Sequence, residues 1–183
     1  MIKTGIFGGS FNPIHNGHLS LAKQLMEKAG LDEVWLMVSP QNPLKESGDL
    51  LSDEARMAMA RAAVIGQEGI IASDYEMHLP RPSYTWNTLQ ALSKDYPERE
   101  FVLMIGGDNW QLFDRWYHAE DILKNYRVVI YPRRGAETAG AVEAELLDIS
   151  STEIRQRLHE GKSIRGLVPR RVEYIIKNNG YYA

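Results

Sequence analysis

The sequence predicts an α/β fold with a mainly parallel sheet of about five to six strands. Short apolar runs of strand length alternate along the chain with longer stretches in which apolar residues recur at helical spacing. The short runs are nearly continuous in apolar residues, which is typical of strands covered on both faces. We therefore expect a Rossmann-like, doubly wound sheet with helices on both faces and with ligands at the carboxyl ends of its strands.

The composition is that of an ordinary globular chain, with 183 residues, 44% hydrophobic and 25% charged. No repeat or linker divides it, so we expect a single domain over residues 1–183. The net charge of −3 does not indicate a binding surface for nucleic acid or for a membrane. No apolar run is long enough to span a bilayer. The absence of cysteine excludes disulfides and thiolate chemistry. Without a signal-peptide pattern, the default location is the cytoplasm.

The first half of the chain is expected to run strand, turn, helix, strand, loop, helix. The glycine and proline residues mark the turn and the loop, and Ser52, followed by two acids, has the pattern of a helix start. These elements are placed at residues 2–7, 8–18, from Leu19 to near Gly30, 33–38, 39–51 and from Ser52 onward.

The second half continues the alternation. The strand at 101–105 is the clearest buried strand of the sequence, and it runs directly into Gly106-Gly107-Asp108. Ser150 and Glu153 have the spacing of a capping box, so a helix should begin there. The remaining elements are a strand at 70–72, a polar segment at 74–83, a helix at 85–94, a short helical region at 110–123, a strand at 128–131, a surface loop at 132–143 and a helix at 169–178.

The turn at 8–18, with the sequence GGSFNPIHNGH, is the first candidate binding element. Glycine lets the backbone approach a ligand closely, and the start of the following helix offers unpaired N–H groups and a partial positive charge, which attract phosphate. His15 and His18 are three residues apart, so both fall on one side of the first helical turn and can donate to one anion. No dinucleotide fingerprint or P-loop is present, and an ordinary glycine-rich turn remains an alternative.

Two motifs at opposite ends of the chain resemble the nucleotidylyltransferase superfamily. They are the H-x-G-H turn inside GGSFNPIHNGH and the segment ISSTEIR at 149–155. The segment SYTWNTL at 83–89, the Gly106-Gly107-Asp108 triplet and Trp116 resemble, within it, the bacterial nicotinate-nucleotide adenylyltransferases. Val168-Pro169 and the apolar residues that follow fit the same family's ending. The resemblance covers essentially the whole chain.

The resemblance implies transfer of an adenylyl group from ATP to nicotinate mononucleotide, giving nicotinate adenine dinucleotide and pyrophosphate. A phosphate monoester has a second pKa of about 6, so the attacking phosphate is already ionised near neutral pH and needs no general base. Catalysis then consists of holding the reacting groups in line and neutralising charge. The sequence accordingly offers no nucleophile or triad to assign.

The resemblance also assigns residues on the ATP side. It implies that His15 and His18 contact the ATP phosphates, with His18 making the stronger contact in the transition state, and that Arg155 binds outer charges of the triphosphate. A solvated surface arginine is the alternative for Arg155, and a simple helix cap is the alternative for Asp108. The remaining residues implied on this side are Gly8, Gly9, Ser10, Phe11, Gly106, Asp108, Ser151 and Thr152.

On the side of the second substrate, the resemblance implies that Trp116 stacks on the pyridine ring and that the backbone of Thr85 meets the nicotinate carboxylate. Tyr84 is placed in the same site, and Lys45 is expected to reach substrate phosphate from its exposed loop. The alternatives are core packing for Trp116, a helix start for Thr85 and a solvated side chain for Lys45.

A few positions depart from the family's pattern. Ser10 and Asn12 stand where threonine and aspartate are usual, and both keep hydrogen-bonding capacity. Leu44 replaces a histidine before Lys45, and Arg134 replaces a proline after Arg133, which leaves a phosphate contact by Arg133 open.

Mg²⁺ is the cofactor that the resemblance implies, held mainly by the ATP phosphates, because a hard cation that keeps several waters needs few protein ligands. No protein metal ligands are predicted, since zinc ligands at suitable spacing are missing around the two histidines. The rival readings are a phosphopantetheine adenylyltransferase, which shares both end motifs, and a nucleotide-binding sensor without chemistry. A class I aminoacyl-tRNA synthetase core would need a longer chain. A homo-oligomer is compatible with the sequence.

Overall fold

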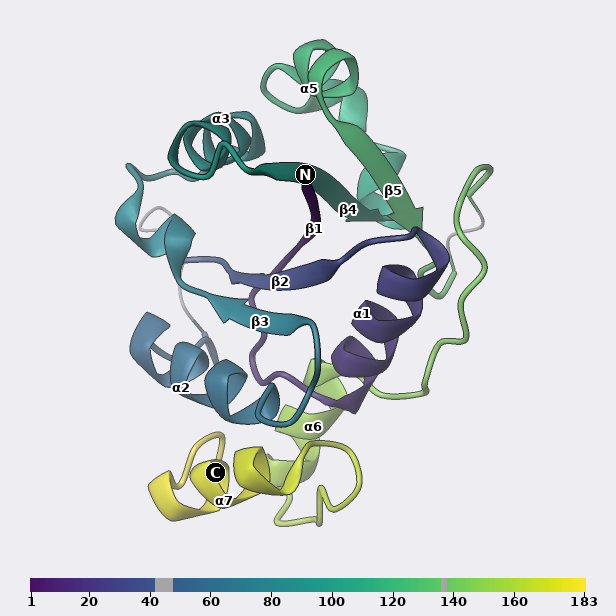
Figure 1. Ribbon diagram of the computed structural model, residues 1–183. Helices are drawn as coiled ribbons and strands as arrows, with labels where there is room; N and C mark the ends of the chain where they lie inside the picture. Colours follow the sequence, from purple (N-terminus) through teal and green to yellow (C-terminus); the bar gives the residue numbers. More distant parts are fainter. Residues whose placement is uncertain (42–47, 136–137) are drawn as a thin grey trace.

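The computed structural model describes residues 1–41, 48–135 and 138–183, and it is built on one sheet of five parallel strands (Figure 1). Their order across the sheet is β3-β2-β1-β4-β5, which confirms the doubly wound, Rossmann-like prediction. The strands are β1 Ile2–Gly9, β2 Glu33–Val38, β3 Ile70–Ser73, β4 Arg99–Gly106 and β5 Arg127–Tyr131.

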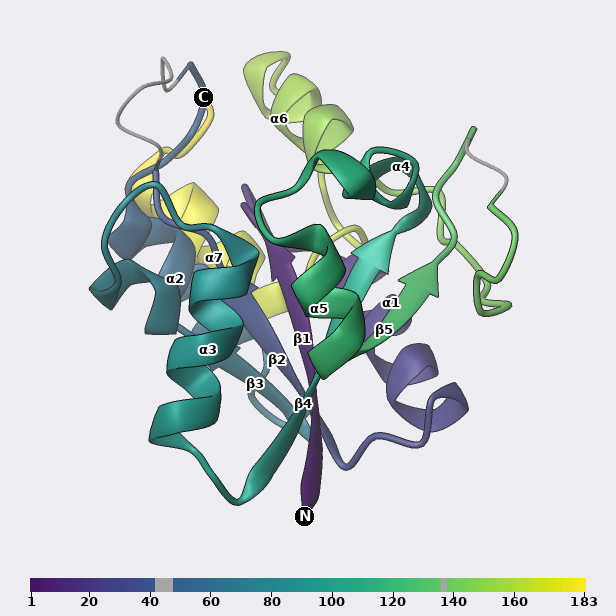
Figure 2. The ribbon, with the colours of Figure 1, turned by 90° about the horizontal axis from the view of Figure 1, so that it is seen from above.

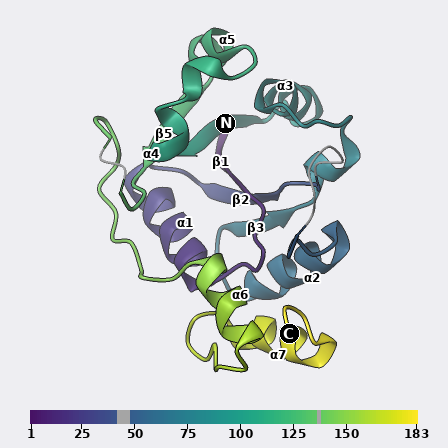
Figure 3. The same ribbon diagram turned by 180° about the vertical axis from the view of Figure 1, so that it is seen from behind.

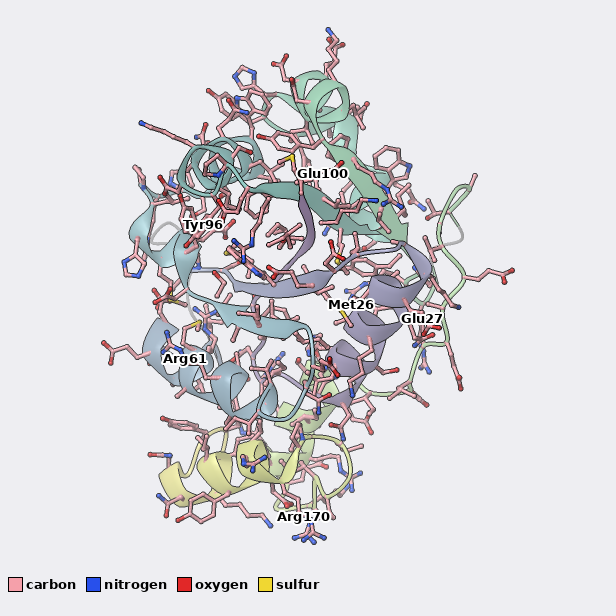
Figure 4. The ribbon with its side chains drawn as sticks, in the orientation of Figure 1. Met26, Glu27, Arg61, Tyr96, Glu100 and Arg170 are labelled. Carbon is pink, nitrogen blue, oxygen red and sulfur yellow. The ribbon has the colours of Figure 1, made fainter. Side chains whose placement is uncertain are left out.

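Helices cover both faces of the sheet, as predicted. Helices α1 (Asn16–Lys28) and α2 (Asp53–Ala63) lie on one face, and α3 (Thr85–Asp95) and α5 (Ala119–Asn125) lie on the other (Figure 1). Each face has its own apolar core, with the helical spacing of apolar residues turned toward the strands. On α1, partly buried Met26 lies toward the sheet and exposed Glu27 points outward (Figure 4). None of the helices in the described ranges is long and apolar enough to cross a bilayer.

Two further helices close the chain on the α1/α2 side. Helix α6 (Ser151–His159) lies beside α2, and helix α7 (Arg170–Asn179) lies next to α6 and below α1 and α2 (Figure 3). Ile154 of α6 and both Val172 and Ile176 of α7 are buried in the core of that face. The segment ISSTEIR at 149–155 thereby lies close to β1.

The central strand β1 is where the chain changes direction across the sheet. Phe7 of β1 pairs with Leu36 of β2 on one side and with Met104 of β4 on the other. Since the chain fills one side of β1 before it crosses to the other, the carboxyl ends of β1 and β4 form the switch point where ligands bind in such folds. Helices α6 and α4 (Gly107–Trp110) lie beyond these strand ends (Figure 2).

One expected element is wrong in detail. The helical region expected at 110–123 is three short pieces: α4, a 3-10 turn at Phe113–Arg115, and α5. His118 takes a left-handed conformation with φ 56°, which no helix interior accepts, and the segment is thereby broken before α5. Its aromatic side chains, Trp110, Phe113 and Trp116, pack against the core instead of following a helical stripe.

Candidate active site at the carboxyl ends of the strands

Two cavities lie at the carboxyl ends of β1 and β4. The first, here called the histidine cleft, has a volume of about 600 Å³ and is lined by His15, His18, Asp108, Ser151, Thr152 and neighbouring residues. The second, here called the Trp116 pocket, has a volume of about 280 Å³ and is lined by Gly8, Gly9, Ser83, Thr85, Trp116 and neighbouring residues. A larger hollow of about 800 Å³, lined by Lys28 and by residues within 132–135 and 138–145, contains none of the residues predicted for the site. We therefore place the site in the first two.

The two histidines form a stacked pair held by the main chain. Their rings lie 3.6 Å apart between centroids, with an angle of 25° between the ring planes. His15 Nδ1 accepts from the N–H of Gly17 at 3.0 Å, and His18 Nδ1 accepts from the N–H of His15 at 3.1 Å. A neutral imidazole that accepts at Nδ1 carries its proton at Nε2. Each ring thus keeps one N–H, at Nε2, for a ligand.

Both imidazoles are held in the uncharged form. Burial, and to a smaller extent the positive charge of Arg133, together lower the pKa of His15 from 6.5 to about 4. Burial, the neighbouring His15 and Arg133 lower the pKa of His18 well below its usual value. The cleft therefore offers an anion two neutral N–H donors at neutral pH.

Gly17 is a site residue that the sequence reasoning did not single out. A Cβ at this position would lie 2.8 Å from Cε1 and 2.9 Å from Nδ1 of His15, closer than side-chain atoms approach one another. Only glycine lets the His15 ring fold back over the helix start and cap it. Its place between the histidines in the H-x-G-H motif is the signal that could have identified it.

The start of α1 differs from the prediction that it would offer free N–H groups to phosphate. The N–H of Asn16 donates to the carbonyl of Leu167 at 2.9 Å, that of Gly17 to His15, and that of His18 to the carbonyl of His15. The His15 side chain and the carbonyl groups of His15 and Leu167 thus accept from the N–H groups that the helix start would have presented. At this helix, the ligand donors are the two imidazoles.

Helix α6 supplies free N–H groups from the opposite side of the cleft. Ser150 caps it by accepting from the N–H of Glu153 at 3.0 Å, which confirms half of the predicted capping box; no return bond from the Glu153 side chain occurs. The N–H groups of Ser151 and Thr152 have no partner in the described part of the chain. A nine-residue helix adds a partial positive charge at this end, so the start of α6 suits phosphate.

The two end motifs are joined directly. Ser151 Oγ donates to the carbonyl of Pro13 at 2.9 Å, and Arg155 Nη1 donates to the carbonyl of Asn12 at 2.9 Å. Arg155 Nη2 also lies 3.3 Å from the hydroxyl of Thr152, which lines the cleft. Arg155 itself does not line the cleft. Its guanidinium holds the two motifs together.

Asn12 is a second residue whose part the sequence reasoning did not identify. Its Oδ1 accepts from the N–H of Leu51 at 3.2 Å and from the hydroxyl of Tyr182 at 2.5 Å, while its Nδ2 donates to the carbonyl of Asp49. Asparagine both accepts and donates, whereas an aspartate could only accept. This explains why the amide fits here in place of the acid that is usual in the family.

Charged residues surround the mouth of the histidine cleft in pairs. Arg133 lies 3.6 Å from Asp108, and Arg134 lies 2.5 Å from Asp148, and all four side chains line the cleft. Both arginines are thus near the place where phosphate would bind, although the sequence left their part open.

The Trp116 pocket holds most of the residues predicted for the second substrate, together with some predicted for ATP. Trp116 and Thr85 line it, as expected for a shared binding site. The ATP-side candidates Gly8, Gly9, Ser10 and Gly106 line this pocket too, and they do not line the histidine cleft. The structure thus brings four candidates for the ATP side into the pocket predicted for the second substrate.

Three predicted residues lie elsewhere. Tyr84 is exposed and packs its ring against Tyr117, 4.9 Å between centroids, outside the pocket lining. Phe11 is buried, and its ring meets that of His18 edge to face at 4.9 Å, so its side chain supports a histidine. Lys45 lies outside the described residues.

The floor of the Trp116 pocket carries polar groups that were not predicted. Glu76 lines it and accepts from the hydroxyl of Thr88 at 3.0 Å. Burial raises the pKa of the Glu76 carboxyl, and the hydrogen bond from Thr88 opposes that rise. Ser83 Oγ is buried there without a hydrogen-bond partner.

Arg56 is the largest residue that the sequence reasoning missed. Its side chain is fully buried and donates to the carbonyls of Ser10, Ser39 and Leu51 and to the carboxylate of Asp53, at 2.7 to 3.0 Å. One guanidinium thus ties the first turn to the end of β2 and to the start of α2. Its neighbour Met57 fits the apolar pattern of α2, but nothing in that pattern indicates a buried arginine.

Comparison with known proteins gives a family match over most of the chain. The cytidylyltransferase-like family model matches residues 6–157. Relatives from Bacteroides fragilis and Cytophaga hutchinsonii, each named "Probable nicotinate-nucleotide adenylyltransferase", are 50% and 44% identical. The matches cover 89% and 100% of this chain and 85% and 99% of the relatives.

Solved structures share the fold over the whole chain. A Vibrio parahaemolyticus protein superposes with a TM-score of 0.76 at 28% identity, covering 100% of this chain and 96% of its own. Plasmodium falciparum nicotinic acid mononucleotide adenylyltransferase, solved in complex with NaAD, superposes with a TM-score of 0.78 at 21% identity, covering 99% and 98%.

Proposed function

Since the chain belongs to the cytidylyltransferase-like family and, within it, to the nicotinate-nucleotide adenylyltransferases, we propose that it transfers an adenylyl group from ATP to nicotinate mononucleotide. The products are nicotinate adenine dinucleotide and pyrophosphate, and the reaction belongs to NAD biosynthesis. The observation that carries this proposal is the adjacency of the two cavities. A cleft with phosphate donors and a pocket with an aromatic wall are lined by neighbouring residues at the ends of β1 and β4: Phe7 and Asp108 line the cleft, and Gly8 and Asn109 line the pocket.

The reaction is an in-line displacement at phosphorus. An oxygen of the nicotinate mononucleotide phosphate attacks the α-phosphorus of ATP, a new P–O bond forms, and the bond to the bridging oxygen of pyrophosphate breaks. The attacking phosphate is ionised near pH 7, because its second pKa is about 6. No side chain has to remove a proton, and the site contributes position and charge stabilisation.

In this proposal the histidine cleft holds the triphosphate. The Nε2–H groups of His15 and His18 donate to phosphate oxygens from one side, and the free N–H groups of Ser151 and Thr152 donate from the other. Donors that are already oriented cost no reorganisation as charge develops on the leaving group. Arg155 fixes the distance between the two sets, since it joins Asn12 to Thr152.

Nicotinate mononucleotide occupies the Trp116 pocket. The indole of Trp116 gives the pyridine ring a face to stack on, and the start of α3 at Thr85 gives its carboxylate N–H donors. Gly8, Gly9 and Gly106 line this pocket at the carboxyl ends of β1 and β4, where the absence of a Cβ lets a substrate approach the backbone closely.

Mg²⁺ is part of the proposal as a companion of ATP. The described residues contain no cluster of three or more histidine or acidic side chains that would hold a metal alone. The carboxylates of Asp108 and Asp148 line the histidine cleft, and one or two carboxylates suffice for a Mg²⁺ that is bound mainly to phosphates. When bound, the ion neutralises part of the phosphate charge.

One incubation tests the function. Purified protein with ATP, Mg²⁺ and nicotinate mononucleotide should release pyrophosphate and form the dinucleotide. Phosphopantetheine in place of nicotinate mononucleotide tests the rival adenylyltransferase, and binding of ATP without pyrophosphate release would indicate a sensor. A cytoplasmic location stays a prediction, consistent with the absence of cysteine, and so does a homo-oligomer.

A further inference from the structure

The turn between β1 and α1 is held in place by side chains from three other parts of the chain. Arg56 of α2 donates to the carbonyl of Ser10 at 2.8 Å. Two side chains of α6 donate to the carbonyls of Asn12 and Pro13, each at 2.9 Å. Because His15 follows this segment directly along the chain, the position of the turn sets the position of the first histidine of the cleft.

The third contributor is Tyr182, which follows helix α7. Its side chain is buried in the core on the α1/α2 face of the sheet, and its hydroxyl donates to Asn12 Oδ1 at 2.5 Å. Burial raises the pKa of this hydroxyl, and the positive charges of Arg155 and Arg56 oppose that rise. The hydroxyl therefore keeps its proton at neutral pH and remains a donor. The two arginines that hold the backbone of the turn lie close to the same hydroxyl.

The backbone of Tyr182 takes an unfavourable conformation in order to make this contact. Its φ of 62° lies in the left-handed region, where a residue with a side chain is strained. Such a conformation persists only where the surrounding contacts hold it, and residues of this kind are concentrated at functional sites. The contacts that hold Tyr182 are its buried ring and its hydrogen bond to Asn12.

The bond between Tyr182 and Asn12 acts on the ATP side of the proposed site. The carbonyl of Asn12 accepts from Arg155, whose second nitrogen lies 3.3 Å from the hydroxyl of Thr152 on the opposite side of the cleft. A displacement of Asn12 would therefore move the two histidines relative to the N–H groups of α6. The described residues that line the Trp116 pocket include neither Tyr182 nor Asn12, so that pocket should be unaffected.

Resting on the proposed function, we propose that Tyr182 is a positioning residue for adenylyl transfer. Through Asn12, its hydroxyl holds the turn at the distance from α6 at which both sets of donors reach the triphosphate. Tyr182 does not line the histidine cleft, so it acts through the turn and not by contact with ATP. A shift of about 1 Å in a reacting geometry can lower a rate about a hundredfold, so even a small displacement of the turn should be measurable.

The test compares Tyr182→Phe with Thr4→Val. The first substitution removes the hydroxyl and keeps the buried ring. Thr4 is fully buried on β1, toward the end of the strand that lies away from the site, and its hydroxyl donates to Glu33 at 3.1 Å. Each variant thus loses one buried, bonded hydroxyl, but only Tyr182 is bonded to the turn. Melting temperature, kcat and the KM for each substrate are measured, with kinetics at a temperature at which circular dichroism shows both variants folded.

We expect both variants to melt at a lower temperature, because each loses a hydrogen bond and leaves a buried acceptor with one donor fewer. Tyr182→Phe should lower kcat about tenfold and raise the KM for ATP severalfold, while its KM for nicotinate mononucleotide stays within about twofold. Thr4→Val should keep kcat and both KM values within about twofold of those of the unsubstituted protein.

Three results would overturn the inference. If Tyr182→Phe melts at a lower temperature but keeps kcat and the KM for ATP, the hydroxyl serves stability alone, while the proposed function stands. Equal losses of kcat in both variants would make the loss a general effect of lower stability. If the KM for nicotinate mononucleotide rises as much as that for ATP, the effect does not belong to the histidine cleft. The proposed function fails separately, and the inference with it, if the unsubstituted protein releases no pyrophosphate.

Discussion

The imidazole of His18 accepts a hydrogen bond from the backbone N–H of His15, and the imidazole of His15 caps the same helix by accepting from Gly17. The two residues thus fix each other's orientation and protonation at Nε2. The side that faces the cleft is free to donate, while the side that faces the helix is used for structure. Each histidine therefore has two separable tasks, one at Nδ1 and one at Nε2.

Substituting His18 with two different amides should separate these tasks. In His18→Asn, the side-chain oxygen can replace Nδ1 as the acceptor for His15, but no donor reaches the Nε2 position. We expect stability close to that of the unsubstituted protein and a fall in kcat of about two to three orders of magnitude, the cost of one oriented donor. Pyrophosphate release and urea unfolding would measure the two effects.

In His18→Gln, the amide nitrogen can reach the Nε2 position, but the N–H of His15 loses its acceptor. This variant should keep more activity than His18→Asn and lose about 1–3 kcal/mol of stability. The opposite ranking of the two activities would contradict the assignment of the ligand donor to Nε2.

The pH dependence of stability should show the lowered pKa of His15. The folded protein holds this pKa at about 4, compared with 6.5 in the unfolded chain, so below pH 6.5 the unfolded state binds more protons. The stability that the uncharged His15 contributes is fully present above pH 6.5. As pH falls toward 4, the free energy of unfolding decreases by about 3 kcal/mol in total. Urea unfolding at pH 7 and at pH 5 would measure the difference.

His15→Asn is the control for this prediction. Asparagine is a good helix cap and does not titrate, so the variant should keep α1 intact and lose part of the acid sensitivity. An unchanged slope of stability against pH would show that His15 is not the group responsible.

A methyl group at position 17 should disturb the site by contact alone. In Gly17→Ala the new Cβ would lie 2.8 Å from the His15 ring, so the ring must turn away and the helix cap must weaken. We expect a stability loss of about 1–3 kcal/mol and a clear fall in kcat. Gly8→Ala is a matched control for stability, because no atom lies within 4 Å of its Cβ position. Similar losses of stability in both variants would count against the steric explanation.

Replacing the buried arginine should be far more costly than replacing an exposed one on the same helix. Arg56→Met leaves three carbonyl groups without their donor, and we expect a loss of about 3–5 kcal/mol. Arg61→Met is the control: its side chain points outward (Figure 4) and pairs with Asp74 at 3.3 Å, so the loss should be under about 1 kcal/mol. Chemical denaturation of the two variants would compare them, and equal losses would contradict the role given to Arg56.

The fold could be predicted from the sequence because its signals are local. The strand at Glu33–Val38 was placed at its exact bounds, since a nearly continuous apolar run between turn residues has few other interpretations. The helix break at His118 could not be foreseen, because a left-handed residue without glycine leaves no compositional mark.

The site residues that belong to a short sequence motif could be predicted. The residues that are brought together from distant parts of the chain could not. His15, His18, Ser151 and Thr152 were found from two short motifs and share one cleft. The bonds of Arg56 and of Asn12 connect residues up to 170 positions apart, and no periodicity carries such information. The unpaired hydroxyl of Ser83 can be recognised only from the folded structure, because the residues packed around it are far from it in the sequence or carry no pattern that indicates burial.

The absence of charge on the two stacked rings also affects the release of the product pyrophosphate. Pyrophosphate departs with several negative charges, and Arg133 and Arg134 already attract it at this cleft. Two imidazolium ions would add to that attraction, whereas uncharged N–H donors add much less. We expect this product to leave faster than it would if both rings were protonated.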